Sequence, residues 1–232
     1  MASPYADRII TIFDGALSIR CMVDSDKDFA FEATFITDHP SFAQFRSGKP
    51  PLHFHPHQEE YISVVEGVVA LEVEGREYIL GPDDGEFLVK PWIIHRLYTV
   101  SASSRGEQES DSNIVRFKSA GQKTPEVLKL DLLFFENWYG YQDEALRNGG
   151  KIDMIQTMCM FDAGGSYILL PSWVPFRRTT SYIVGVIVGR WLGTLLGYQP
   201  YYRQWSTDWH LACEKMDGSF FYRKWAKESK FE

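Results

Sequence analysis

Cysteine is scarce in this chain of 232 residues, and the three that occur, Cys21, Cys159 and Cys213, lie far apart. Their number is odd, and no two of them form a Cys-x-x-Cys pair. This pattern argues against a disulfide framework and against a cysteine-based zinc site, and it is typical of buried thiols in a reducing compartment. The N-terminus also lacks a basic segment followed by an apolar stretch, so a secretory signal is not expected. We therefore expect a cytoplasmic protein.

Basic residues are also in the minority. The chain has 24 lysines and arginines against 31 aspartates and glutamates, which gives a net charge of −7. Proteins that bind nucleic acid through its phosphates need a clustered basic face, so we expect no nucleic-acid partner. Apolar residues make up 44% of the chain, which at this length can fill the core of one domain with an appendage, or of two small domains.

The first half of the chain reads as short strands separated by turns. Segments rich in β-branched and aromatic residues predict strands at Ile9–Phe13, Leu17–Val23, Phe29–Thr37 and Asn113–Lys118. The stretch Tyr61–Leu80 reads as consecutive strands, with Glu66-Gly67 and Glu74-Gly75 as tight turns. Residues 101–112 are polar and predict a loop. Many short strands at close spacing indicate a sandwich or a closed barrel.

The second half reads as helices. Leucines, phenylalanines and a tryptophan recur at helical spacing over Val127–Arg147, and Gly149-Gly150 would end that helix. Ile152–Phe161 predicts a second, shorter helix. No internal repeat relates the two halves. We therefore expect a β domain over residues 1–120 and a helical, aromatic-rich extension over residues 121–232 that packs on the β domain or on a partner.

The segment Ser181–Tyr198 raises the question of a membrane. Eight of its residues are Ile, Val or Leu, each worth roughly −0.3 to −0.6 kcal/mol at the bilayer centre, but Arg190 in the middle costs about 2.5 to 3.5 kcal/mol. The sum is near zero, and the length is at the lower limit for a span. We favour a helix packed on protein, with peripheral membrane contact through residues 181–198 as the alternative and a membrane span as the least favoured reading.

Histidine is rare as well, yet three of the six histidines lie within residues 53–57. His53 and His55 are two residues apart, so on a strand both side chains point to the same face. Glu60 opens the next apolar strand, and His95 begins another. Two histidines and a carboxylate can bind a metal ion while leaving positions open for a substrate or O2, and a further histidine can close the site.

These residues resemble two known motifs. His53-x-His55-x4-Glu60-x6-Gly67 matches the first motif of the cupin superfamily, and Gly85-x5-Pro91-x3-His95 resembles the second. The second motif departs from the family at Ile93, where glycine is usual, and it lacks the asparagine expected near Thr99. The resemblance covers about half of the chain, Ile9–Lys118. The helical tail is similar to that of single-cupin proteins from fungal and bacterial metabolite gene clusters.

The resemblance implies a mainly β fold, a cupin (jelly-roll-like) β-barrel followed by a C-terminal helical extension. It also implies one divalent metal ion per chain, held by His53, His55, Glu60 and His95. Iron is the favoured metal, with zinc, manganese, nickel and copper left open. We expect catalytic roles for Glu60 and for His57. Because Pro56 bends the chain, His57 is placed at the pocket rim or beside the ligands rather than among them.

Strand parity gives part of the lining of the expected site. Residues that share a face with Glu60 or with His95 are apolar: Ile62, Val64, Ile93 and Leu97. We therefore expect a metal-dependent enzyme acting on a hydrophobic, oxygenated small molecule, as in specialised metabolism, and we favour an oxygenase. A non-oxidative isomerase, cyclase or lyase and a non-catalytic binding cupin remain as alternatives. Single-barrel cupins commonly pair through a sheet edge, so a homodimer is also expected.

Overall fold

The computed structural model describes residues 3–41, 49–100, 113–147, 149 and 151–228. The predicted loop over residues 101–112 and the predicted helix stop at Gly150 fall outside this range. The chain forms two compact units. The first contains Met1–Phe54 and Gln58–Lys123, and the second contains His55–His57 and Thr124–Glu232.

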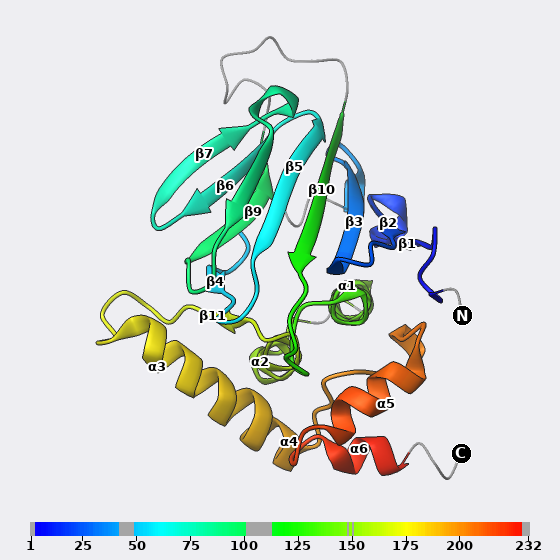
Figure 1. The fold of residues 1–232 in the computed structure, drawn as a ribbon, viewed down its shortest axis with the longest axis vertical. Coiled ribbons are helices and arrows are strands. Elements are labelled where there is room, and N and C mark those ends of the chain that lie inside the picture. Colours follow the sequence, from blue (N-terminus) through cyan, green and yellow to red (C-terminus); the bar gives the residue numbers. More distant parts are fainter. Residues whose placement is uncertain (1–2, 42–48, 101–112, 148, 150, 229–232) are drawn as a thin grey trace. The chain divides into compact units, whose positions relative to one another are not determined.

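The first unit is built from strands (Figure 1). They are β1 (Ile9–Ile12), β2 (Leu17–Met22), β3 (Lys27–Ile36), β4 (His53–Phe54), β5 (Glu60–Glu66), β6 (Val69–Val73), β7 (Arg76–Leu80), β8 (Glu86–Val89), β9 (His95–Thr99) and β10 (Ile114–Gln122). They pair antiparallel in two sheets, ordered β1-β2-β3-β10-β5-β8 and β4-β9-β6-β7. The predicted β-strand first half and helical C-terminal region are confirmed, with the strands arranged as two antiparallel sheets.

Residues from both sheets meet in an apolar cluster. Ile62 on β5, Leu71 on β6 and Val89 on β8 are at most 2% exposed and pack together. Partly buried apolar side chains surround them: Val73, Leu80, Phe87, Ile93 and Leu97. Burying one such side chain contributes about 1.5–3 kcal/mol, so this cluster helps to stabilise the unit.

Of the two predicted tight turns, one closes a hairpin and the other connects the two sheets. Glu74 and Gly75 both have positive φ, as a two-residue hairpin turn requires, and they join the paired strands β6 and β7. Glu66-Gly67 does not close a hairpin, because β5 pairs with β10 and β8 whereas β6 belongs to the other sheet. Gly67 has a φ of 71°, and a Cβ there would lie 2.9 Å from the carbonyl oxygen of Ile114. Glycine is therefore required where the chain crosses between sheets.

The second unit is mostly helical. Its elements are α1 (Leu132–Arg147), α2 (Met154–Ala163), β11 (Tyr167–Ile168), α3 (Arg177–Val184), a π-helical stretch (Gly185–Leu192), α4 (Gly193–Leu196), α5 (Trp209–Asp217) and α6 (Arg223–Glu228). Both α1 and α2 begin later than predicted. Asp131 accepts a hydrogen bond from the backbone N–H of Phe134, and Asp153 accepts from those of Ile155 and Gln156. These aspartates cap the helices and set where they start.

The segment Arg177–Leu196 forms one continuous helical run through α3, the π-helical stretch and α4. By length and composition alone, it is long and apolar enough to cross a membrane. Its glycine face packs on α2, since a Cβ on Gly189 would lie 2.3 Å from the carbonyl oxygen of Met158. Arg190 donates two hydrogen bonds, of 2.8 and 2.9 Å, to the buried carboxylate of Asp162 on α2. The arginine that makes this segment costly in a bilayer thus has a partner inside the unit.

Candidate metal centre

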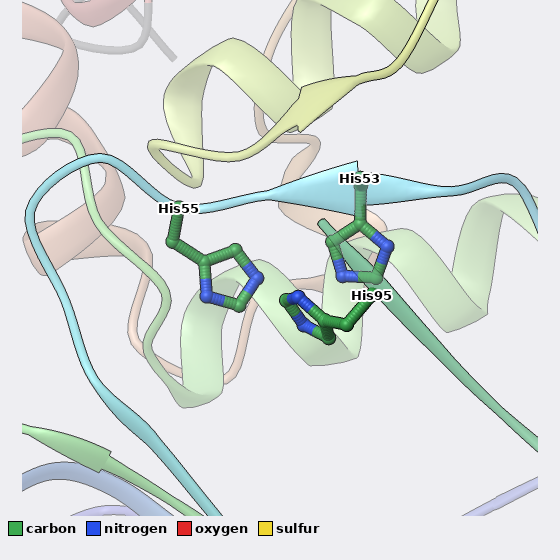
Figure 2. A group of neighbouring side chains, drawn as sticks. All are labelled: His53, His55 and His95. Carbon is green, nitrogen blue, oxygen red and sulfur yellow. The ribbon is translucent and has the colours of Figure 1, made fainter. Parts of the chain in front are cut away.

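Strand β4 and strand β9 bring the motif histidines together. His53 lies opposite His95 in the antiparallel pairing of these strands, and the two ring centroids are 4.4 Å apart. His55 follows His53 by two residues, and both rings point to the same side of the chain (Figure 2). One ring nitrogen from each of the three histidines lies within 4.8 Å of those from the other two. His55 and His95 are 3% and 1% exposed.

Backbone carbonyl groups orient two of the rings in the same way. The Nδ1 atom of His95 lies 2.9 Å from the carbonyl oxygen of Ile93, and that of His53 lies 3.2 Å from the carbonyl oxygen of Pro51. A carbonyl oxygen can only accept, so each Nδ1 carries a hydrogen, which in the neutral ring leaves the lone pair on Nε2. This tautomer is the one in which Nε2 can bind a metal ion.

Glu60 stands beside His95 at the start of β5. Its Oε2 atom lies 3.2 Å from His95 Nε2, while its Oε1 atom accepts a hydrogen bond of 2.8 Å from the hydroxyl of Ser119 on β10. Two ligands at right angles on one ion, each about 2.1 Å from it, would lie about 3 Å apart. The spacing therefore fits neighbouring positions on one metal ion. Ser119 was not identified from the sequence, although it is buried and fixes the carboxylate.

The turn before His95 forms without the family's glycine. The backbone N–H of Ile93 donates to the carbonyl oxygen of Lys90 at 3.2 Å, with Pro91 and Trp92 between them. Trp92 carries the positive φ, 66°, which this type of turn requires and which glycine usually supplies. Its ring stacks on Phe54, the buried residue between His53 and His55, at a centroid distance of 5.3 Å. This contact links the two histidine-bearing strands.

A further side chain holds the segment that connects β4 to β5. Gln58 is 3% exposed, and its amide donates to the carbonyl oxygen of Gln122 at 3.0 Å and to the carboxylate of Asp28 at 3.3 Å. It was not identified from the sequence either. His57, predicted to be catalytic, is exposed and is not one of the three clustered histidines. Its place at the pocket rim stays a prediction.

The donor set suits a divalent transition metal. Three imidazole nitrogens and one carboxylate form a mixed nitrogen and oxygen environment that accepts iron, manganese, zinc, nickel or copper. Beyond the histidines, Ile62 on β5, Leu97 on β9 and Ile93 in the turn before β9 all belong to the apolar cluster of the first unit. Three of the four apolar residues expected to line the site therefore pack in one cluster, and their role as a pocket wall stays a prediction.

Burial gives His53 an unusual acidity. It lowers the pKa of His53 to about 3, His95 adds to the effect, and Glu60 opposes it. A histidine whose folded pKa is depressed contributes stability above its unfolded value of about 6.5 and loses it as the pH falls towards 3.

For the metal-free protein, we expect the urea concentration at the unfolding midpoint to decrease as the pH is lowered from about 7 to about 5. The variant His53→Gln should show a smaller decrease than the parent. The exposed His210 provides the control, because His210→Gln should keep the parent's slope. Equal slopes for the parent and His53→Gln would contradict the assignment.

Comparison with known proteins agrees with the geometry. A family model described as "Cupin domain" matches residues 46–104. The chain is 40% identical over 221 residues to a probable oxidoreductase, yanE, of Aspergillus niger, and the match covers 94% of this chain and 83% of the relative. It is 41% identical over 184 residues to an epoxidase, atD, of Aspergillus terreus, with 79% of this chain and 55% of the relative covered. The chain thus spans most of the first relative and about half of the second.

Among solved structures, the polyketide cyclase RemF from Streptomyces resistomycificus is 18% identical. The aligned part covers 54% of this chain and 81% of that chain, with a TM-score of 0.33.

Proposed function

The chain belongs to the cupin superfamily, and we propose that it is an oxidative enzyme that uses one divalent metal ion held by His53, His55, His95 and Glu60. The observation that supports this most directly is the convergence of three histidine ring nitrogens within 4.8 Å, with a carboxylate oxygen 3.2 Å from one of them. We further propose iron as the metal, because the relatives that match along most of this chain are named oxidoreductases and an epoxidase.

A bound divalent ion of this kind supplies a Lewis acid and, if it is iron, a centre for O2 and a chelating substrate. Residues of the chain orient the side chains that would bind this ion. The carbonyl groups of Pro51 and Ile93 accept from the two Nδ1 atoms, so Nε2 is the nitrogen that each ring would offer to the ion. The hydroxyl of Ser119 holds one oxygen of Glu60, which leaves the other oxygen directed at His95.

We propose that the substrate is a hydrophobic small molecule with a chelating oxygen group, as in specialised metabolism. The supporting observation is the apolar side chains that share strands with the ligands, among them Ile62 and Leu97. An apolar wall excludes bulk water and strengthens the electrostatic effect of a charged centre. A small sugar or a highly charged metabolite would need Arg, Asn or Gln side chains in these places.

The oxygen dependence of turnover tests the proposed reaction class. The iron-loaded protein is incubated with a panel of aromatic hydroxy-carbonyl compounds in air and under nitrogen, while O2 uptake and products are followed. We expect product and O2 uptake in air and neither under nitrogen. The rate should be at least about 100-fold lower for Glu60→Gln, since loss of a residue that only orients a metal ligand already lowers activity by about 10–100-fold. Product formation under nitrogen would instead identify a non-oxidative isomerase, cyclase or lyase. Tight binding of a panel compound without turnover in either atmosphere would leave a binding protein.

A further inference from the structure

The helical run Arg177–Leu196 carries apolar side chains on the face that does not pack within its unit. Ile183, Ile187, Trp191 and Leu195 follow one another at intervals of four residues and are 48%, 43%, 44% and 81% exposed. We call these four residues the apolar ridge. The buried face of the same helical run carries Gly185, Gly189 and Gly193. A soluble helix of an isolated protein normally shows polar side chains on its outer face, so such a ridge marks an interaction surface.

Exposed aromatic residues extend the ridge at both ends. Trp173 and Phe176 precede the helix and are 82% and 87% exposed. Beyond the ridge, Phe221 stacks on Trp191 at 5.5 Å, and its neighbour Phe220 is 73% exposed. The run from α3 to α4 is the long yellow-to-ochre helix in Figure 1. Aromatic side chains at the ends of an apolar helical face are typical of helices that lie in a membrane interface.

The charged residues around the apolar ridge indicate the kind of partner that it binds. The 45 residues from Ala163 to Thr207 contain four arginines and no aspartate, glutamate or lysine, although the whole chain has a net charge of −7. The aspartates that flank this stretch are engaged within the unit, since Asp162 is buried against Arg190 and Asp208 accepts from the backbone N–H of Leu211. Because Arg190 is paired with Asp162, the other three arginines give this stretch its net positive charge.

The cations lie at the two ends of the ridge. Arg178 is exposed at the start of α3, and the guanidinium of Arg223 lies over the ring of Phe220 at 5.4 Å. A second copy docked by two-fold symmetry would place this surface against itself, and the stretch Ala163–Thr207 would bring no acidic side chain to the contact. Anionic lipid headgroups would pair with them, while the acyl boundary would cover the apolar side chains.

We propose that this surface binds the interface of an anionic lipid membrane, with the helical run lying in the plane of the bilayer. A transmembrane arrangement is disfavoured because the glycine face packs on α2 and Arg190 is held by the carboxylate of Asp162, contacts that a span would have to break. The binding is independent of the metal ion, so its test is separate from that of the proposed function.

Sedimentation of the full chain with lipid vesicles tests the proposal. Vesicles of phosphatidylcholine alone are compared with vesicles that contain about 30% phosphatidylserine, at about 0.1 M salt. We expect binding to the anionic vesicles at least fivefold stronger than to the neutral ones. Leu195→Glu and Ile187→Glu should each weaken binding to both kinds at least tenfold. Arg178→Ala combined with Arg223→Ala should remove the preference for anionic vesicles.

The matched control is Ile9→Glu, which adds the same charge at an aliphatic residue that is 63% exposed on β1 of the first unit. It should bind vesicles as the parent does, and circular dichroism should show all variants folded. Absence of parent binding to anionic vesicles, or unchanged binding of Leu195→Glu, would overturn the proposal. If the parent does not bind vesicles but forms a dimer in light scattering, and Leu195→Glu dissociates that dimer, the apolar ridge would be the contact with a second copy instead.

Discussion

His95→Ala is expected to purify without the metal ion that we propose for the parent. His95 is the residue through which the proposed ligands are connected: its ring lies 4.4 Å from that of His53, and its Nε2 atom lies 3.2 Å from Glu60. Loss of a group that merely orients a ligand weakens metal affinity by about 10–100-fold, so loss of the ligand itself should weaken it by at least about 100-fold. Turnover should fall in the same proportion.

The measurement is metal content by mass spectrometry on protein purified without a chelator. We expect near one ion per chain in the parent and less than about a tenth of that in His95→Ala, as follows from the loss of affinity. His210→Ala is the matched control, because His210 lies exposed on α5 and contacts Glu214 rather than the cluster. Ser119→Ala should give an intermediate result, since it frees the Glu60 carboxylate without removing it. Equal metal content in the parent and His95→Ala, or no metal in the parent even after reconstitution, would contradict the proposed site.

The sequence was sufficient to bring the three histidines together. His53 and His55 are two residues apart on an extended segment, so their shared face is a matter of local geometry. His95 required the cupin resemblance, because the pairing of β4 with β9 joins residues 42 positions apart (95 − 53). Once that pairing was assumed, strand parity also placed Ile62 and Leu97 in one apolar layer, as they are found.

The groups that support the ligands could not be predicted in the same way. Ser119 lies 59 residues after Glu60, and a serine in a strand has no periodicity that distinguishes it from any other polar residue. The positive φ of Trp92 goes against local preference, since bulky residues rarely adopt it, and the stacking on Phe54 helps to hold it. By contrast, aspartate is a common residue at the start of a helix. Taking Asp131 and Asp153 as N-terminal caps would have predicted the starts of α1 and α2 correctly from the sequence.

Arg190 shows how a distant partner changes the meaning of a residue. In the sequence it was only a cost to burial in a bilayer, because nothing local identifies a partner 28 residues away. In the structure its guanidinium binds Asp162, which is fully buried and also accepts hydrogen bonds from Tyr222 at 2.8 Å and Tyr167 at 3.3 Å. The pair joins the π-helical stretch to α2, so it should support the stability of the whole helical unit.

Arg190→Met is therefore expected to destabilise the second unit by about 3–5 kcal/mol, because it leaves an uncompensated carboxylate in the interior. Tryptophan fluorescence during urea unfolding reports on this unit, since six of the seven tryptophans lie after residue 124 and only Trp92 lies before it. Arg147→Met provides the control. Arg147 pairs with Asp143 on the surface of α1, and its loss should cost less than about 1 kcal/mol.

The pH dependence of this loss distinguishes the buried charge from a mere packing defect. Burial raises the pKa of Asp162, and Arg190 opposes that effect through its hydrogen bonds and charge. Without Arg190 the pKa of Asp162 should rise further above the unfolded value of about 3.9. A carboxyl whose folded pKa is raised contributes stability at low pH and loses it as the pH rises through that pKa. The deficit of Arg190→Met should thus shrink as the pH is lowered from neutrality, and adding Asp162→Asn should recover much of it at pH 7. A deficit that is the same at every pH and in the double variant would show that Arg190 acts through packing alone.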